Sequence, residues 1–156
     1  MEKTWIFNKL VDKSVLYQGL TFPIAVHERL YESIGMQLKH GVTVPIEVEV
    51  NGRIFEAKLQ NLNFKKKKFP NRSDIVQIRY GLDLAEYMHE LFPTTAATVE
   101  EYLEKRLSGA KRLKIENDKR EYIRVYVVDH SPSFSLECLP LGTEMNDIFS
   151  EETFSE

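Results

Sequence analysis

The sequence predicts one α+β domain built on a mostly antiparallel, partly closed β-barrel with two or three short helices. Three observations lead to this fold class. The chain has 156 residues, of which 42% are hydrophobic, which is enough for a single hydrophobic core. Five or more segments have the apolar and polar alternation of strands with one buried face. Only short stretches have helical spacing, and a set of antiparallel strands with few helices is typical of an α+β sheet or barrel.

The elements before the middle of the chain are an early strand, a helix and a hairpin. We expect the strand over 14–20 and the helix over 25–34, which places Val26, Leu30 and Ile34 on one face and ends at Gly35. The hairpin joins 44–50 to 53–59 through Asn51-Gly52, a pair that favours a two-residue type I′ turn because both positions accept a positive φ.

The hairpin turn sets a register in which Val50 pairs with Arg53. Its buried face is then predicted to carry Val44, Ile46, Val48, Phe55, Ala57 and Leu59. The opposite face carries Glu47, Glu49, Glu56 and Lys58, and Glu47 lies directly across from Glu56.

The remaining elements are three strands and two helices. A strand is expected over 75–80, and a helix over 82–92 ends at Pro93. A capping box of Thr98 and Glu101 is expected to begin a helix over 98–107 that ends at Gly109. Two further strands are expected over 121–128 and 133–138.

The net charge of −3 is distributed unevenly along the chain. Residues 53–80 contain eight Lys or Arg and two Asp or Glu, whereas 143–156 contain five Asp or Glu and no Lys or Arg. We therefore expect a globular domain over 1–142 and an acidic, disordered tail over 143–156. A binding partner contacts a local surface and responds to the charge of that surface, so the negative net charge does not argue against nucleic-acid binding.

Cysteine usage and hydropathy favour a cytoplasmic protein without a membrane partner. Cys138 is the single cysteine, no apolar run approaches the roughly 20 residues of a membrane helix, and the N-terminus does not resemble a signal peptide. Cys138 alternates with Phe134 and Leu136, which indicates a core position and not a nucleophile.

The most distinctive segment is a run of four lysines between two aromatic residues in the loop expected over 61–74. Clustered cations suit phosphate groups, whereas neighbouring amide and guanidinium groups can contact base edges. The predicted nucleic-acid contacts are Lys65, Lys66, Lys67, Lys68, Asn71, Arg72, Gln77 and Arg79, with Lys39 as a further candidate. The alternative is a solvated loop whose lysines keep a strand edge soluble.

Catalytic and metal-binding patterns are weak, so we expect no cofactor, no catalytic residue and no metal ligand. The histidines lack metal-ligand spacing, and the sequence has no P-loop or nucleophile elbow. One alternative remains, in which Glu47 and Glu56 hold Mg²⁺ and Lys58 orients water or a phosphate, as in a metal-dependent nuclease.

The order of the elements resembles a known family. Thr21-Phe-Pro-Ile24, a short helix, the hairpin, the basic loop, the strand ending at Tyr80 and a helix ending at Leu91-Phe92 are similar to the DNA-binding pseudobarrel of some type II restriction endonuclease effector domains and plant-specific transcription factors. The resemblance covers roughly residues 14–139. It implies a non-catalytic domain with two loop-bearing arms that grip the DNA major groove. Residues 65–72 would belong to one arm, and Lys39 and His40 would form a second contact surface.

The sequence therefore predicts a non-catalytic domain that binds nucleic acid, double-stranded DNA in particular, with a link to restriction or other defence systems. A second hypothesis is a protein-interaction module or inhibitor in phage–host defence, in which the acidic tail contacts a protein partner. The Mg²⁺-dependent nuclease is the third.

Overall fold

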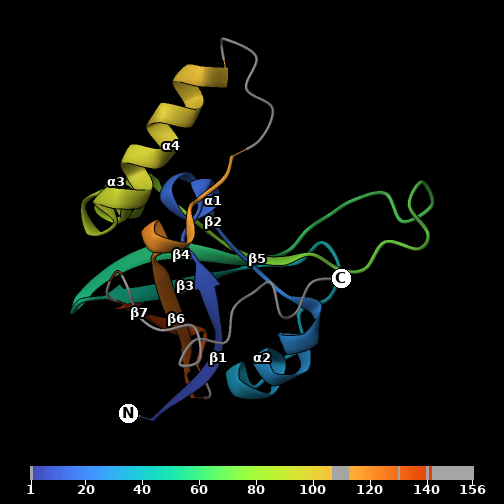
Figure 1. The fold of residues 1–156 in the computed structure, drawn as a ribbon. Coiled ribbons are helices and arrows are strands. Elements are labelled where there is room, and N and C mark those ends of the chain that lie inside the picture. Colours follow the sequence, from blue (N-terminus) through green and yellow to red (C-terminus); the bar gives the residue numbers. More distant parts are fainter. Residues whose placement is uncertain (1, 107–112, 130, 140, 142–156) are drawn as a thin grey trace.

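The computed structural model describes residues 2–106, 113–129, 131–139 and 141, and the predicted acidic tail lies outside them. The described residues form an α+β fold with a seven-stranded sheet in the order β1-β6-β7-β3-β4-β5-β2 (Figure 1). The strands are β1 (Lys3–Leu10), β2 (Gly19–Phe22), β3 (Thr43–Val50), β4 (Arg53–Asn61), β5 (Val76–Tyr80), β6 (Tyr122–Val128) and β7 (Ser133–Leu139). The α-helices are α1 (Lys13–Tyr17), α2 (His27–Ile34), α3 (Leu82–Leu91) and α4 (Pro93–Arg106), with 3₁₀ turns η1 (Ile24–Val26) and η2 (Asn117–Lys119).

The sheet curls into a nearly closed barrel, which confirms the predicted fold class. Neighbouring strands are antiparallel except β3 and β7, which pair in parallel over a short stretch from Glu47 and Ser133. The two end strands approach each other through the core, because the rings of Phe7 on β1 and Phe22 on β2 lie 5.4 Å apart. Arg29 of α2 donates to the carbonyl of Ile6, so this helix contacts the end strand β1.

The hairpin of β3 and β4 has the predicted register. Val50 pairs with Arg53, and Glu47 lies opposite Glu56. Asn51 and Gly52 have φ values of 52° and 81°, as a type I′ turn requires. The side chains of the predicted inner face are buried, except that Val44 is half-buried. The alternation of apolar and polar residues therefore predicted correctly which side chains pack in the core.

The N-terminal part of the chain differs from its prediction. The strand predicted over 14–20 is wrong: residues 13–17 form α1, and only the following residues form the strand β2. The Asp12 side chain accepts a hydrogen bond from the Val15 backbone N–H, which caps the helix, and Val15 and Leu16 are both buried. The strand β1 was not predicted, because four consecutive residues from Ile6 to Lys9 are buried and the alternation is lost.

Helix α2 confirms the predicted helix and its end at Gly35, which has a φ of +79°. Helix α3 also confirms its prediction and stops before Pro93. The predicted start of the next helix at Thr98 is wrong, because α4 begins at Pro93 and the Thr98 hydroxyl donates to the Thr94 carbonyl inside the helix. The predicted end at Gly109 lies outside the described residues.

The N-terminus of α4 is capped by a residue far along the chain. Glu121, which is buried, accepts hydrogen bonds from the Thr95 backbone N–H and hydroxyl, each at 2.8 Å. A carboxylate stabilises this end of a helix by satisfying free N–H groups and by its charge. A cap from such a distant residue has no local sequence signal, which is why the start of this helix was predicted wrongly.

Candidate nucleic-acid interface

The predicted basic segment lies in a long loop, residues 62–75, that joins β4 to β5 and is here called the basic loop. The basic loop extends away from the barrel, as the green to yellow-green segment of Figure 1 shows. Its two ends are held together where β4 and β5 separate, because the Leu62 N–H donates to the Ile75 carbonyl at 2.8 Å. The basic loop is therefore an arm on a rigid two-stranded support.

The base of this arm is anchored to residues 38–41, which precede β3. Asn61, 1% exposed, donates from Nδ2 to the Leu38 carbonyl at 3.0 Å and to Asp74 Oδ2 at 3.2 Å. His40 Nε2 donates to the Phe64 carbonyl at 2.9 Å, since a carbonyl oxygen can only accept. The Gly41 N–H donates to the Asn61 carbonyl. These contacts fix the direction in which the basic loop leaves the barrel.

The tip of the basic loop is itself folded. The Lys65 carbonyl accepts from the backbone N–H groups of Lys68 and Phe69, and the Phe69 carbonyl accepts from Arg72. The Arg72 guanidinium lies 5.0 Å from the centre of the Phe64 ring and 5.5 Å from that of Phe69. Cation–π attraction of this kind holds the side chain across the two rings.

The electrostatics of the basic loop are dominated by its five cations. Asp74 is the one carboxylate in this loop, and Lys66 Nζ lies 3.1 Å from it. The hydrogen bond from Asn61 lowers the pKa of Asp74; burial opposes this effect, and Lys66 adds to it. Within the described part of the chain, no carboxylate oxygen lies within 4.0 Å of the charged groups of Lys65, Lys67, Lys68 or Arg72. These four residues are exposed.

The structure brings Lys39 together with the basic loop. Lys39 is exposed and adjoins His40, which contacts the base of that loop. Asn71 is also exposed and lies on the basic loop itself. Sequence reasoning found the four lysines and Arg72 but not the anchoring roles of Asn61 and Asp74, because Asn61 bonds to Leu38, a residue distant in sequence, and Asp74 bonds to Asn61 and Lys66.

Gln77 and Arg79 lie apart from the tip, on the outer face of β5. Gln77 is half-buried, and its amide accepts from Gln60 at 3.0 Å and donates to Thr21 at 3.4 Å. Arg79 is exposed and donates to Gln77 at 3.4 Å. The amide of Gln77 is thus engaged within the sheet, whereas Arg79 presents its charge on the surface.

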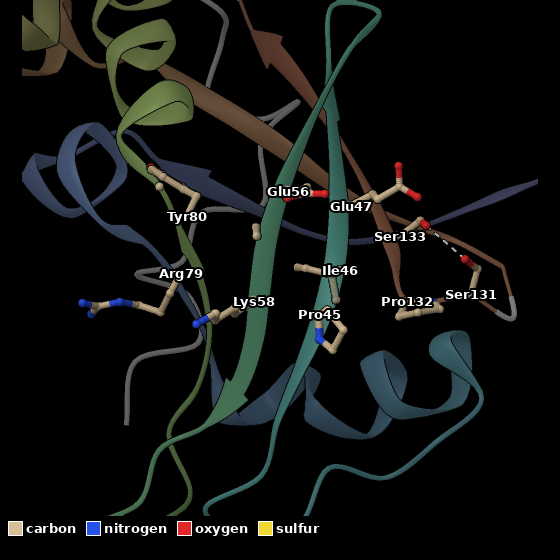
Figure 2. Close-up of a pocket in the computed structure, with 12 residues that line it drawn as sticks. Pro45, Ile46, Glu47, Glu56, Lys58, Arg79, Tyr80, Ser131, Pro132 and Ser133 are labelled. Carbon is tan, nitrogen blue, oxygen red and sulfur yellow. Dashed lines mark hydrogen bonds between the residues drawn. The ribbon is translucent and has the colours of Figure 1, made fainter.

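The acidic face of the hairpin lines a hollow of about 930 Å³ on the outside of the sheet. Glu47, Glu56, Lys58 and Arg79 contribute to its wall, and the turn before β7 closes one side (Figure 2). Figure 2 shows the Glu47 carboxylate directed toward Ser133. No cluster of three or more His, Cys, Asp or Glu suited to a metal ion occurs among the described residues.

Cys138 is half-buried and packs against the core, as its alternation predicted. Burial, reinforced by the charges of Glu121 and Glu137, raises the pKa of its thiol to about 11. The thiol is therefore protonated near neutral pH, and a protonated thiol is a poor nucleophile.

Comparisons with known proteins give one weak structural likeness. No family model and no curated protein matches the chain. The N-terminal domain of Helicobacter pylori LlaJI.R1 is similar over 94% of this chain and 87% of that chain, at 10% identity and a TM-score of 0.43. No helix in the described ranges is long and apolar enough to cross a membrane. The function of this chain is therefore inferred from its own surface.

Proposed function

We propose that this chain is a non-catalytic DNA-binding domain whose basic loop contacts the phosphates of double-stranded DNA. The observation that carries the proposal is the exposure of Lys65, Lys67, Lys68 and Arg72 on a protruding arm without a neighbouring carboxylate among the described residues. Each lysine or arginine that neutralises a phosphate releases condensed counterions, which is the main source of affinity in sequence-independent binding.

The shape of the basic loop supports the same function. An arm that stands off a barrel can enter a groove, where phosphates lie on both sides of it. Its backbone hydrogen bonds and anchors are present before any ligand arrives, so little conformational entropy is lost on binding. Lys39 at the base and Arg79 on β5 are further phosphate contacts in this proposal, and Asn71 is the exposed amide suited to a base edge.

The test compares two variants that remove the same charge. One replaces Lys65, Lys66, Lys67 and Lys68 by alanine. The matched control replaces four exposed cations on and beyond α4, namely Lys105, Arg106, Lys114 and Lys119. These lie in a part of the molecule that Figure 1 shows to be far from the basic loop. Binding to a short labelled duplex is measured by fluorescence anisotropy as a function of salt.

We expect the basic-loop variant to bind at least about 100-fold more weakly at low salt. Its plot of log affinity against log salt should be flatter by roughly 0.9 for each phosphate that the variant no longer neutralises. The control variant should be weakened much less. Absence of duplex binding by the unmodified protein at low salt, or equal weakening in the two variants, would contradict the proposal.

A further inference from the structure

Phe69 is a large apolar side chain at the tip of the basic loop. It is 42% exposed. Single exposed apolar residues are common on protein surfaces and need no explanation by themselves. This one differs because its neighbours along the loop are the cations that the proposed function assigns to phosphates.

The two aromatic rings of the basic loop have different surroundings. The ring of Phe64 is half-buried, meets the edge of the His40 ring at 4.7 Å, and lies beneath Lys66 and Arg72, each 5.0 Å from its centre. Phe69 has no aromatic partner among the described residues. Phe64 thus packs at the base of the loop, whereas the Phe69 side chain, 42% exposed, is partly open to a ligand.

Cations lie on both sides of Phe69 in the chain. Lys68 Nζ is 5.8 Å from the ring centre, and the Arg72 guanidinium is 5.5 Å from it. In a nucleic acid strand, each base is likewise joined to a backbone that has a phosphate on either side. An aromatic ring with two cations within about 6 Å of its centre therefore offers a stacking surface together with groups for the neighbouring phosphates of a strand whose base is free to stack.

We propose that Phe69 stacks on a nucleobase, so that the basic loop, which contacts duplex phosphates in the proposed function, binds more tightly still where a base is unstacked, as in single strands, gaps or mismatches. This inference rests on the proposed function and names the form of DNA that the same site prefers. In a fully paired duplex both faces of each base are covered, so the ring reaches a base face only by separating a step. Phosphate contacts alone would instead favour the duplex, whose charge density is higher.

The test uses three ligands: a single-stranded oligo(dT), a fully paired duplex of equal length, and heparin, a polyanion without bases. The full chain is compared with Phe69→Ala and with Phe69→Tyr, the conservative variant that keeps an aromatic ring. Phe69→Trp adds a fluorescent reporter at the same position, measured as a difference from the unmodified protein, which contains Trp5 alone. Circular dichroism shows whether each variant is folded.

We expect the unmodified protein to bind oligo(dT) more tightly than the duplex. Phe69→Ala should weaken binding to oligo(dT) by roughly 5- to 100-fold, the range measured for one stacked base, without changing the salt slope. Phe69→Tyr should restore that affinity, and heparin should bind all three proteins equally. Oligo(dT) should quench the added tryptophan, and heparin should not.

The inference is overturned if Phe69→Ala binds oligo(dT) as tightly as the unmodified protein, or if its affinity for heparin falls as much as its affinity for oligo(dT). In either case the lysine variant would still report whether the phosphates are bound. If the unmodified protein does not bind the duplex at low salt, the proposed function fails whatever the result with Phe69→Ala, so the two failures are distinguishable.

Discussion

Strand β4 begins at a tight turn and ends at a long arm, and the two ends are specified in different ways. The turn consists of Asn51 and Gly52, both with a positive φ, and needs no partner outside the hairpin. The basic loop is held by residues that are distant in sequence, since Asn61 bonds to Leu38 and His40 bonds to Phe64. The short connection is encoded locally, and the long one depends on the assembled barrel.

The residues at the two ends of β4 also differ in their roles. Asn51 and Gly52 serve only to let the backbone adopt the positive φ values of the turn. In the basic loop, a few anchors at the base hold the backbone, and the exposed lysine side chains lie at the tip, where the proposed function places the phosphates. Loops that carry function are commonly built this way, on a rigid support.

The largest expected effect comes from breaking the anchor of the basic loop. Asn61→Ala removes both hydrogen bonds from Nδ2 and leaves buried or half-buried acceptors with fewer partners, so we expect a loss of about 2 kcal/mol in the free energy of unfolding. Asn63→Ala, at an exposed position two residues along, is the matched control and should change stability little. Urea denaturation measures both, and similar losses would contradict the anchoring role.

The next effect comes from straining the tight turn. The φ of Gly52 is +81°, and a Cβ atom there would meet nothing within 4 Å, so Gly52→Ala tests backbone conformation without a clash. We expect a loss of about 1 kcal/mol, and a smaller loss in Gly52→Asn because asparagine tolerates a left-handed conformation. Thermal denaturation measures the order of the variants. If asparagine is as damaging as alanine, the conformational explanation is wrong.

Gly52→Ala should also leave DNA affinity unchanged, whereas Asn61→Ala should weaken it, because only the latter releases the arm. Anisotropy titrations of the two variants at one temperature, at which both are folded, provide this comparison. A loss of affinity in Gly52→Ala would show that the two ends of β4 are not independent.

The smallest effect is the pH dependence of the loop base. Because the pKa of Asp74 is lowered in the folded protein, its carboxylate stabilises the fold above the ordinary carboxyl pKa, and this contribution is lost as the pH falls through the lowered value. Asp74→Asn should therefore be less stable than the unmodified protein near neutral pH, by under about 1 kcal/mol because solvent screens a side chain that is 39% exposed, and the gap should close in acid. Melting temperatures measured from neutral pH into acid check this prediction. Asp118→Asn, which removes an exposed carboxylate on η2, is the control for the loss of one negative charge.

Most of the barrel could be predicted from the sequence because apolar and polar residues alternate along most of its strands. The alternation of β3 and β4, the Asn-Gly turn between them and the glycine that ends α2 are signals within a few residues. The basic loop could be predicted for the same reason, because a run of four lysines is a local feature of the sequence and does not depend on the tertiary structure. Strand β1 and the start of α4 were missed because their burial and capping come from remote elements, Glu121 in the latter case.

By itself, the sequence determined the α+β fold class, the register of the hairpin and the identity of the cationic residues, because these depend on local periodicity, turn conformation and charge. Only the tertiary structure decided that Asp74 engages Lys66 and leaves the other loop cations without a nearby carboxylate among the described residues, and that Phe69 is exposed at the tip whereas Phe64 is half-buried against His40. Those outcomes depend on which side chains the closing barrel brings within a few ångströms of one another.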